Sequence, residues 1–250
     1  MARMTPVTRS LFPATDQMTR HLFTSALFAG LSAGLLAALL QFVFVVPLLL
    51  EGELYESGVR VHFASSLDAP VQSPSGPAEG LSQDPSRHLM TAGFNVVAYT
   101  AFALIMVAGM ALADRAGHII TPRQGILWGL AGFVALHLAP AIGLPPELPG
   151  TIAAEVELRQ VWWLATVACT LLGLGLIAFG KNTVMIALGI IALALPHIMG
   201  APHLDTYFGI APPELSAHFA TRSLGVAAAS WVILGTLTAY FWTRNGAETD

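Results

Sequence analysis

Residues 22–50 read LFTSALFAGLSAGLLAALLQFVFVVPLLL, a run of 29 residues without a single charged side chain. A helix needs roughly 20 mostly apolar residues to cross the hydrocarbon core of a bilayer. The run is also too long for the apolar region of a signal peptide, which has about 7–15 residues. It therefore predicts a membrane-spanning helix that tilts or projects beyond the bilayer.

Five further apolar stretches follow along the chain, at about residues 92–113, 125–143, 161–179, 184–199 and 223–242. The stretch at 184–199 is short for a span. A transmembrane barrel is disfavoured because its strands give short segments of alternating hydropathy rather than long apolar runs. The sequence predicts an all-α, polytopic helical membrane protein with about six transmembrane helices.

The composition agrees with this fold class. Of the 250 residues, 55% are hydrophobic and only 10% are charged, and the mean hydropathy is +0.68. Soluble domains carry about 25% charged residues, so an ordinary soluble enzyme and a disordered chain are both excluded. The net charge is −4, and the sequence contains no basic patch that would predict a nucleic-acid partner.

The domain organisation follows from where the polar segments lie. Residues 1–19 are polar, contain Pro6 and Pro13, and are predicted to form a disordered tail. Residues 20–243 are predicted to form a single transmembrane domain with a polar outer loop at about 51–90. Residues 244–250 form a short C-terminal tail.

Small residues recur at a spacing of four in two of the predicted helices. The first carries Ala26, Gly30, Gly34 and Ala38, and the third carries Gly125 and Gly129. A stripe of small side chains lets two membrane helices approach closely. These stripes therefore predict where the helices pack.

The distribution of basic residues predicts that the N-terminus faces the cytoplasm. With that orientation, seven basic residues fall inside, namely Arg3, Arg9, Arg20, Arg115, Arg123, Lys181 and Arg244. Four fall outside, namely Arg60, Arg87, Arg159 and Arg222. Most of the carboxylates and six of the eight histidines also fall on the outer side, so one face of the protein concentrates imidazole and carboxylate groups.

One pattern occurs twice on that outer side. His137-Leu138 is followed by Gly143 and by Pro-Pro-Glu-Leu at 145–148, and 66 residues later His203-Leu204 is followed by Gly209 and by Pro-Pro-Glu-Leu at 212–215. Both copies connect an outward-going helix to an inward-going one. We interpret them as two helical hairpins related by a parallel repeat, a device common in transporters.

Histidine and carboxylate side chains together suit divalent first-row metal ions. The predicted metal-binding residues are His137, Glu147, His197, His203, Asp205, Glu214 and His218, with Glu53 and Glu56 in an acidic vestibule that raises the local cation concentration. Other interpretations remain for these residues. Loop carboxylates are often only solvated, and His137 and His197 could hydrogen-bond a carbonyl group between helices.

Arg159 lies just before Trp162-Trp163 and has two interpretations. It fits an interfacial belt of Trp and Arg side chains, or an ion pair with Glu147 or Glu155.

Several short motifs resemble those of the CbtA family of predicted cobalt transporter subunits. They are Pro47-Leu48 with Glu53 and Tyr55-Glu56, Pro146-Glu147-Leu148-Pro149-Gly150, Arg159-Gln160 with Trp162-Trp163, and Pro196-His197 with Gly200-Ala201-Pro202. The resemblance extends from about Arg20 to Trp242. It implies about five spans, cobalt uptake linked to cobalamin supply, and a small partner, CbtB, with one span and a His-rich end.

These observations lead to one expectation and two alternatives. We expect a non-enzymatic permease or permease subunit for Co²⁺, or for Ni²⁺, in the bacterial cytoplasmic (inner) membrane, with no permanently bound cofactor. The alternatives are a membrane-embedded metalloenzyme or haem protein that uses the same histidines, and a non-catalytic assembly subunit of a membrane complex.

Overall fold

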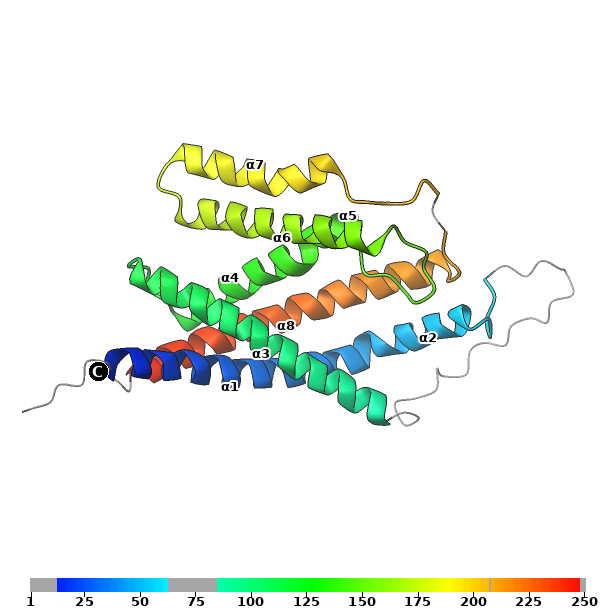
Figure 1. Ribbon diagram of the computed structural model, residues 1–250. Helices are drawn as coiled ribbons and strands as arrows, with labels where there is room; N and C mark the ends of the chain where they lie inside the picture. The colour runs from blue at the N-terminus through cyan, green and yellow to red at the C-terminus, as the bar shows by residue number, and fades with distance from the viewer. Residues whose placement is uncertain (1–12, 63–84, 207, 248–250) are drawn as a thin grey trace, which may run out of the picture.

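The computed structural model describes residues 13–62, 85–206 and 208–247. Its helices, in chain order, are α1 (Pro13–Phe44), α2 (Val46–Glu56), α3 (Pro85–Arg115), α4 (Pro122–Phe133), the π-helix η1 (Val134–Leu138), α5 (Ala139–Gly143), α6 (Val156–Phe179), α7 (Thr183–Met199) and α8 (Pro213–Ala247). The described part of the chain is entirely helical apart from its connections, as the sequence predicts (Figure 1).

Five of these helical segments are long and apolar enough to cross a membrane, namely Met18–Phe44, Pro85–Arg115, Pro122–Gly143, Val156–Phe179 and Pro213–Arg244. The sixth expected span is α7, which has only 17 residues. At 1.5 Å per residue α7 is about 25 Å long, less than a typical hydrocarbon core. The protein is thus a multi-pass membrane protein, and the part of the chain that the structure describes has five long spans and one shorter apolar helix.

Prolines explain where the long helices change course. The first apolar stretch is divided at Val45, and Pro47 lies in the first turn of α2, where a missing N–H costs least. The third span widens into η1 just before Pro140, whose ring would clash with a carbonyl four residues earlier in a regular α-helix. The expected spans at 22–50 and 125–143 are therefore present but are each built from more than one helical segment.

The segments outside the spans differ in part from the expected boundaries. The tail predicted for residues 1–19 is helical from Pro13 onward, because proline is well suited to the first helical turn; residues 1–12 lie outside the described residues. The polar loop predicted at about 51–90 contributes its first residues to α2 and its last residues to α3. Residues 63–84 lie outside the described residues, as do residues 248–250 of the C-terminal tail.

Helices α1, α3, α4 and α8 form the main body. Within it, α1 packs on α3 and on α8, and α4 packs on α8. The small-residue stripes predicted from the sequence lie in these contacts: Gly30 faces the backbone of Thr100, and Gly129 faces the backbone of Trp231. Side chains at these glycines would force the helices apart, so the stripes set the helix spacing.

Helices α6 and α7 form a separate antiparallel pair beside this body (Figure 1). The two helices touch at Gly173 and Gly189, where each backbone carbonyl lies against the other glycine. The pair meets the main body mainly through η1 and α5. In the predicted repeat, α4 and α6 would form one hairpin, and α7 and α8 the other. In the structure α4 packs mainly on α8 and α6 mainly on α7, so the two helices of each hairpin are not each other's main neighbours. The repeat itself stays a prediction.

Candidate functional site

The candidate site begins at the end of the bundle where both Pro-Pro-Glu-Leu segments lie, which we call the Pro-Pro end. It consists of α2, residues 144–155, residues 200–206 and 208–212, and the first turns of α8. A small apolar cluster holds it together: Leu148, Ala211 and Phe219 are buried, and Leu215 and side chains of α2 pack against them. The two copies of the repeated motif thus converge on one cluster through their leucines.

Gly150 fixes the turn in the first of these segments. Its φ angle of 77° lies in the left-handed region that favours glycine. A Cβ atom at this position would also meet the side chain of Ile210, which precedes the second motif. The connections on either side of the Pro-Pro end are therefore packed against each other.

Arginine side chains neutralise three of the carboxylates at this end. Arg60 pairs with Glu51, and Arg87 contacts both carboxylate oxygens of Glu53. Arg159 donates a hydrogen bond to Glu147 at 2.9 Å. Of the two roles that the sequence offered for Arg159, this contact is the ion pair rather than the interfacial belt alone. These contacts reduce the field that the acidic vestibule presents to a cation. Glu56 is exposed and lies just beyond them on α2.

Four of the predicted ligands are exposed at the Pro-Pro end, namely His203, Asp205, Glu214 and His218. The Nδ1 atom of His203 lies 3.0 Å from the carbonyl oxygen of Leu204. Glu214 and His218 are four residues apart in α8, so their side chains emerge on the same helix face. This spacing allows two side chains of one helix to coordinate one metal ion, as in zinc-binding helices.

His137 lies within the third span and is engaged by aromatic side chains. It belongs to η1, and the indole N–H of Trp231 donates to its Nδ1 atom at 3.2 Å. The ring of Phe133 lies 6.3 Å from it. A neutral imidazole has one acceptor nitrogen, and here Trp231 occupies it. His137 must therefore break this hydrogen bond before it can bind a metal ion.

His197 is different, because its ring faces a cavity. It follows Pro196 in α7, and the indole N–H of Trp162 donates to the Pro196 carbonyl at 3.2 Å. The Trp162 ring packs edge-on against the His197 ring, with 6.1 Å between centroids. Trp162 thereby fixes the position of His197 relative to α6.

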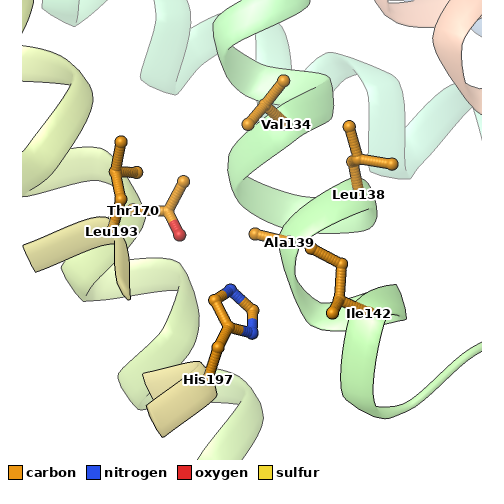
Figure 2. Close-up of a pocket in the computed structure, with 7 residues that line it drawn as sticks. All are labelled: Val134, Leu138, Ala139, Ile142, Thr170, Leu193 and His197. Atoms are coloured by element: carbon orange, nitrogen blue, oxygen red, sulfur yellow. The ribbon is translucent and has the colours of Figure 1, made fainter. Parts of the chain in front are cut away.

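The cavity lies between η1 and α5 on one side and α6 and α7 on the other, and has a volume of about 240 Å³. Its lining is apolar apart from two side chains, and consists of Val134, Leu138, Ala139, Ile142, Thr170, Leu193 and His197. Figure 2 shows the His197 ring and the Thr170 hydroxyl turned into this space.

The predicted metal-binding residues do not meet in one place. In the part of the chain that the structure describes, no three His, Cys, Asp or Glu side chains lie close enough to hold a metal ion. The residues instead divide into an exposed set at the Pro-Pro end, arginine-paired carboxylates, and His137 and His197 within the spans. Their assignment as ligands stays a prediction, but as separate positions rather than one centre.

Sequence reasoning did not identify Thr170 or the π-helix. Threonine is common in membrane helices, so Thr170 gives no signal of its own. The signal that could have pointed to the π-helix is Pro140, three residues after His137 inside an apolar span, because a proline there makes a regular α-helix impossible. π-helical segments occur frequently at functional sites, and this one forms a wall of the cavity.

The model of the CbtA family, described as "probable cobalt transporter subunit (CbtA)", matches residues 19–243. No curated protein and no solved structure matches the chain. The match includes all of α3, α4 and α6, most of α1 and α8, and both Pro-Pro-Glu-Leu segments.

Proposed function

The chain belongs to the CbtA family of probable cobalt transporter subunits, and from this premise we propose that it is the membrane subunit of a Co²⁺ uptake system in the bacterial inner membrane. The observation that carries the proposal is the family match over residues 19–243 of a chain with five span-like helices. Ni²⁺ is the other cation that the same ligand types accept. We assign the protein no catalytic step and no permanently bound cofactor.

We place the Pro-Pro end outside the cell and the N-terminus inside. The distribution of basic residues supports this orientation, because cytoplasmic segments of membrane proteins carry an excess of Lys and Arg. Four basic residues lie at the Pro-Pro end, and the other seven lie at the opposite end or in the N-terminal tail. In this orientation the exposed histidines and carboxylates meet the cation first.

Glu214 and His218 are the best placed residues for the first capture of the ion. Both are exposed, they share a face of α8, and His203 and Asp205 lie in the connection before this helix. A ligand pair with few partners binds weakly, which allows an ion to enter and leave again. Glu53 and Glu147 contribute less, because each already pairs with an arginine.

The ion then passes toward His197 at the edge of the α6–α7 pair. His137 joins the path only if its hydrogen bond with Trp231 opens. Glu56 and the other carboxylates at the Pro-Pro end act as a weak electrostatic attraction for cations.

A transporter subunit implies a partner, and we propose a small CbtB-like protein with one span and a His-rich end. Helix α7 supports this partner: many of its apolar side chains are exposed, and within the described chain it packs mainly on α6. A single partner helix beside α7 would lie next to His197.

Metal accumulation in cells tests the proposal. Cells that lack other cobalt importers are grown in submicromolar Co²⁺, Ni²⁺ or Zn²⁺, with and without this protein and its small partner, and their metal content is measured by mass spectrometry. We expect selective accumulation of Co²⁺, reduced several-fold by the double variant Glu214→Gln, His218→Gln. Absence of accumulation, with the protein inserted and the partner present, would refute the function.

A further inference from the structure

The cavity between η1 and α5 on one side and α6 and α7 on the other has an apolar surface and is open rather than enclosed (Figure 2). Thr170 is fully buried, so His197 is the one polar side chain that reaches this surface. An ordered water molecule needs about two to four polar partners, and cavities without them stay dry. The lining therefore fits an apolar occupant.

The cavity lies at membrane depth. Thr170 is 14 residues from the start of α6 at Val156 and 9 residues from its end at Phe179. At 1.5 Å per residue these separations are about 21 Å and about 14 Å. The bilayer at this depth consists of acyl chains, which are the apolar molecules that can enter an open cavity there.

The volume of the cavity fits part of one acyl chain. An engineered apolar cavity of about 150 Å³ in another protein stays dry and binds benzene, which has six carbon atoms. The cavity here has a volume of about 240 Å³. In proportion, it has room for about ten carbon atoms.

The two walls of the cavity continue as apolar surface toward the end of the bundle opposite the Pro-Pro end. Leu127 of α4, Ile177 of α6 and Ile186 of α7 are exposed, and each lies seven residues, or about two helical turns, from a residue of the cavity lining. The rings of Phe179 and Trp128 lie 6.4 Å apart near that end. An acyl chain that enters the cavity from this end therefore meets apolar side chains along its length.

Both walls end in exposed basic side chains. Arg123 lies 11 residues before Val134 of the lining, and Lys181 lies 11 residues after Thr170. These separations are roughly 16 Å at 1.5 Å per residue, close to half of a hydrocarbon core, about 15 Å. The ion pairs of the described chain involve other basic residues, so both charges are available to an anionic headgroup.

We propose that this cavity binds an acyl chain of an anionic phospholipid from the leaflet opposite the Pro-Pro end, with the lipid headgroup at Arg123 and Lys181. The α6–α7 pair meets the main body mainly through η1 and α5, so the bound chain supplies packing between the two parts that the protein itself lacks. The proposal goes beyond Co²⁺ uptake, and its test does not involve the metal.

The test measures which phospholipid the protein retains. Wild type and variants are placed in lipid nanodiscs of equal amounts of dioleoyl phosphatidylglycerol, which is anionic, and dioleoyl phosphatidylethanolamine, which is zwitterionic. The phospholipid that stays bound after release of the protein is identified by native mass spectrometry. The small partner is added in a parallel sample, and unfolding midpoints are measured for all proteins.

One variant fills the cavity and a second removes the headgroup contacts. Ala139→Phe places a ring in the cavity, and its control Ala168→Phe adds the same ring at an exposed position of α6 outside the lining. The double variant Arg123→Gln, Lys181→Gln changes only exposed side chains, so it keeps the test decisive if Ala139→Phe does not fold. Its control is Arg20→Gln, Arg244→Gln, which removes two exposed charges elsewhere at the same end.

We expect wild type to retain one phospholipid, with phosphatidylglycerol favoured at least threefold over phosphatidylethanolamine. Ala139→Phe should lower the retained lipid at least fivefold, and Ala168→Phe should stay within twofold of wild type. The double variant Arg123→Gln, Lys181→Gln should lose the preference for phosphatidylglycerol, and its control should keep it.

Three results would overturn the lipid site. They are equal lipid retention by Ala139→Phe and wild type, equal loss in both phenylalanine variants, and an unchanged headgroup preference in Arg123→Gln, Lys181→Gln. If Ala139→Phe releases the small partner instead of a lipid, the occupant is a partner helix and the proposal is wrong. None of these results bears on Co²⁺ uptake, which is measured separately.

Discussion

The contact between α4 and α8 provides a sensitive test of the packing. A Cβ atom added at Gly129 would lie 2.2 Å from the carbonyl oxygen of Trp231 and 3.0 Å from the Cα atom of Val232. Both are backbone atoms, so no side-chain rotation relieves the overlap. The variant Gly129→Ala must therefore push the two helices apart by about 1 Å, the shortfall from an ordinary van der Waals contact.

The cost of this displacement can be estimated. A radial gap of 0.5–1 Å already forfeits about a quarter to a half of the dispersion energy of each contact, and inserting a methyl group into a packed interior costs typically about 1–3 kcal/mol. Alanine recovers up to about 1 kcal/mol through its higher helix propensity. With the full gain subtracted, the net loss of unfolding free energy is about 0–2 kcal/mol. The control described next shares the gain in helix propensity, so Gly129→Ala should be less stable than that control by about 1–3 kcal/mol.

The assay is equilibrium unfolding in mixed micelles, followed by tryptophan fluorescence and circular dichroism. The control is Gly225→Ala in α8, because a Cβ atom there has no neighbour within 4 Å in the described structure. We expect the control to be as stable as wild type or more stable by up to about 1 kcal/mol. Equal stabilities for Gly129→Ala and Gly225→Ala would refute the proposed packing of α4 on α8.

Three further substitutions test individual contacts by the same unfolding assay. Trp231→Phe removes the hydrogen bond to His137 and should cost about 1 kcal/mol; no loss would mean that this bond does not form. Asn95→Leu removes the hydrogen bond that Asn95 in α3 donates to Gln41 in α1, and it should lower the unfolding free energy by roughly 0.6 kcal/mol. A variant more stable than wild type would contradict a stabilising role for this hydrogen bond. Glu147→Gln breaks the ion pair with Arg159 and should lower the unfolding free energy by at most about 1 kcal/mol. Co²⁺ accumulation by this variant should stay within twofold of wild type. A large loss of uptake would instead make Glu147 a metal ligand.

Much of the fold follows from the sequence because a bilayer admits few arrangements. Long uncharged runs must be helical to satisfy their backbone hydrogen bonds, and the Gly30 and Gly129 stripes indicate where helices touch. The pairing of α6 with α7, rather than with α4, could not be predicted, because it depends on three-dimensional packing at Gly173 and Gly189. The division of the third span into α4, η1 and α5 accommodates Pro140, but the sequence leaves open which kind of helical irregularity the proline produces.

The candidate site was less predictable than the fold. Residue type and side of the membrane single out His197 and Glu214, but not their neighbours. Glu53 looked like a free carboxylate, whereas Arg87, 34 residues later in the sequence, pairs with it. The pair of Arg159 with Glu147, in contrast, was one of the alternatives that the sequence offered. His137 looked equivalent to His197, yet its ring accepts a hydrogen bond from Trp231 in α8 while His197 faces the cavity. Such differences arise from tertiary contacts that spacing along the chain does not encode.

Co²⁺ transport by this protein is measured most directly as Co²⁺ flux into sealed, right-side-out membrane vesicles that contain the protein and its small partner. Vesicles separate transport from adsorption, because an external chelator removes metal that is only bound to the surface. We expect chelator-resistant Co²⁺ to enter these vesicles at a rate well above that of vesicles without the protein, with little uptake of Mg²⁺. Equal Co²⁺ content in the two kinds of vesicle, with the protein present in the membrane, would contradict a role in Co²⁺ uptake.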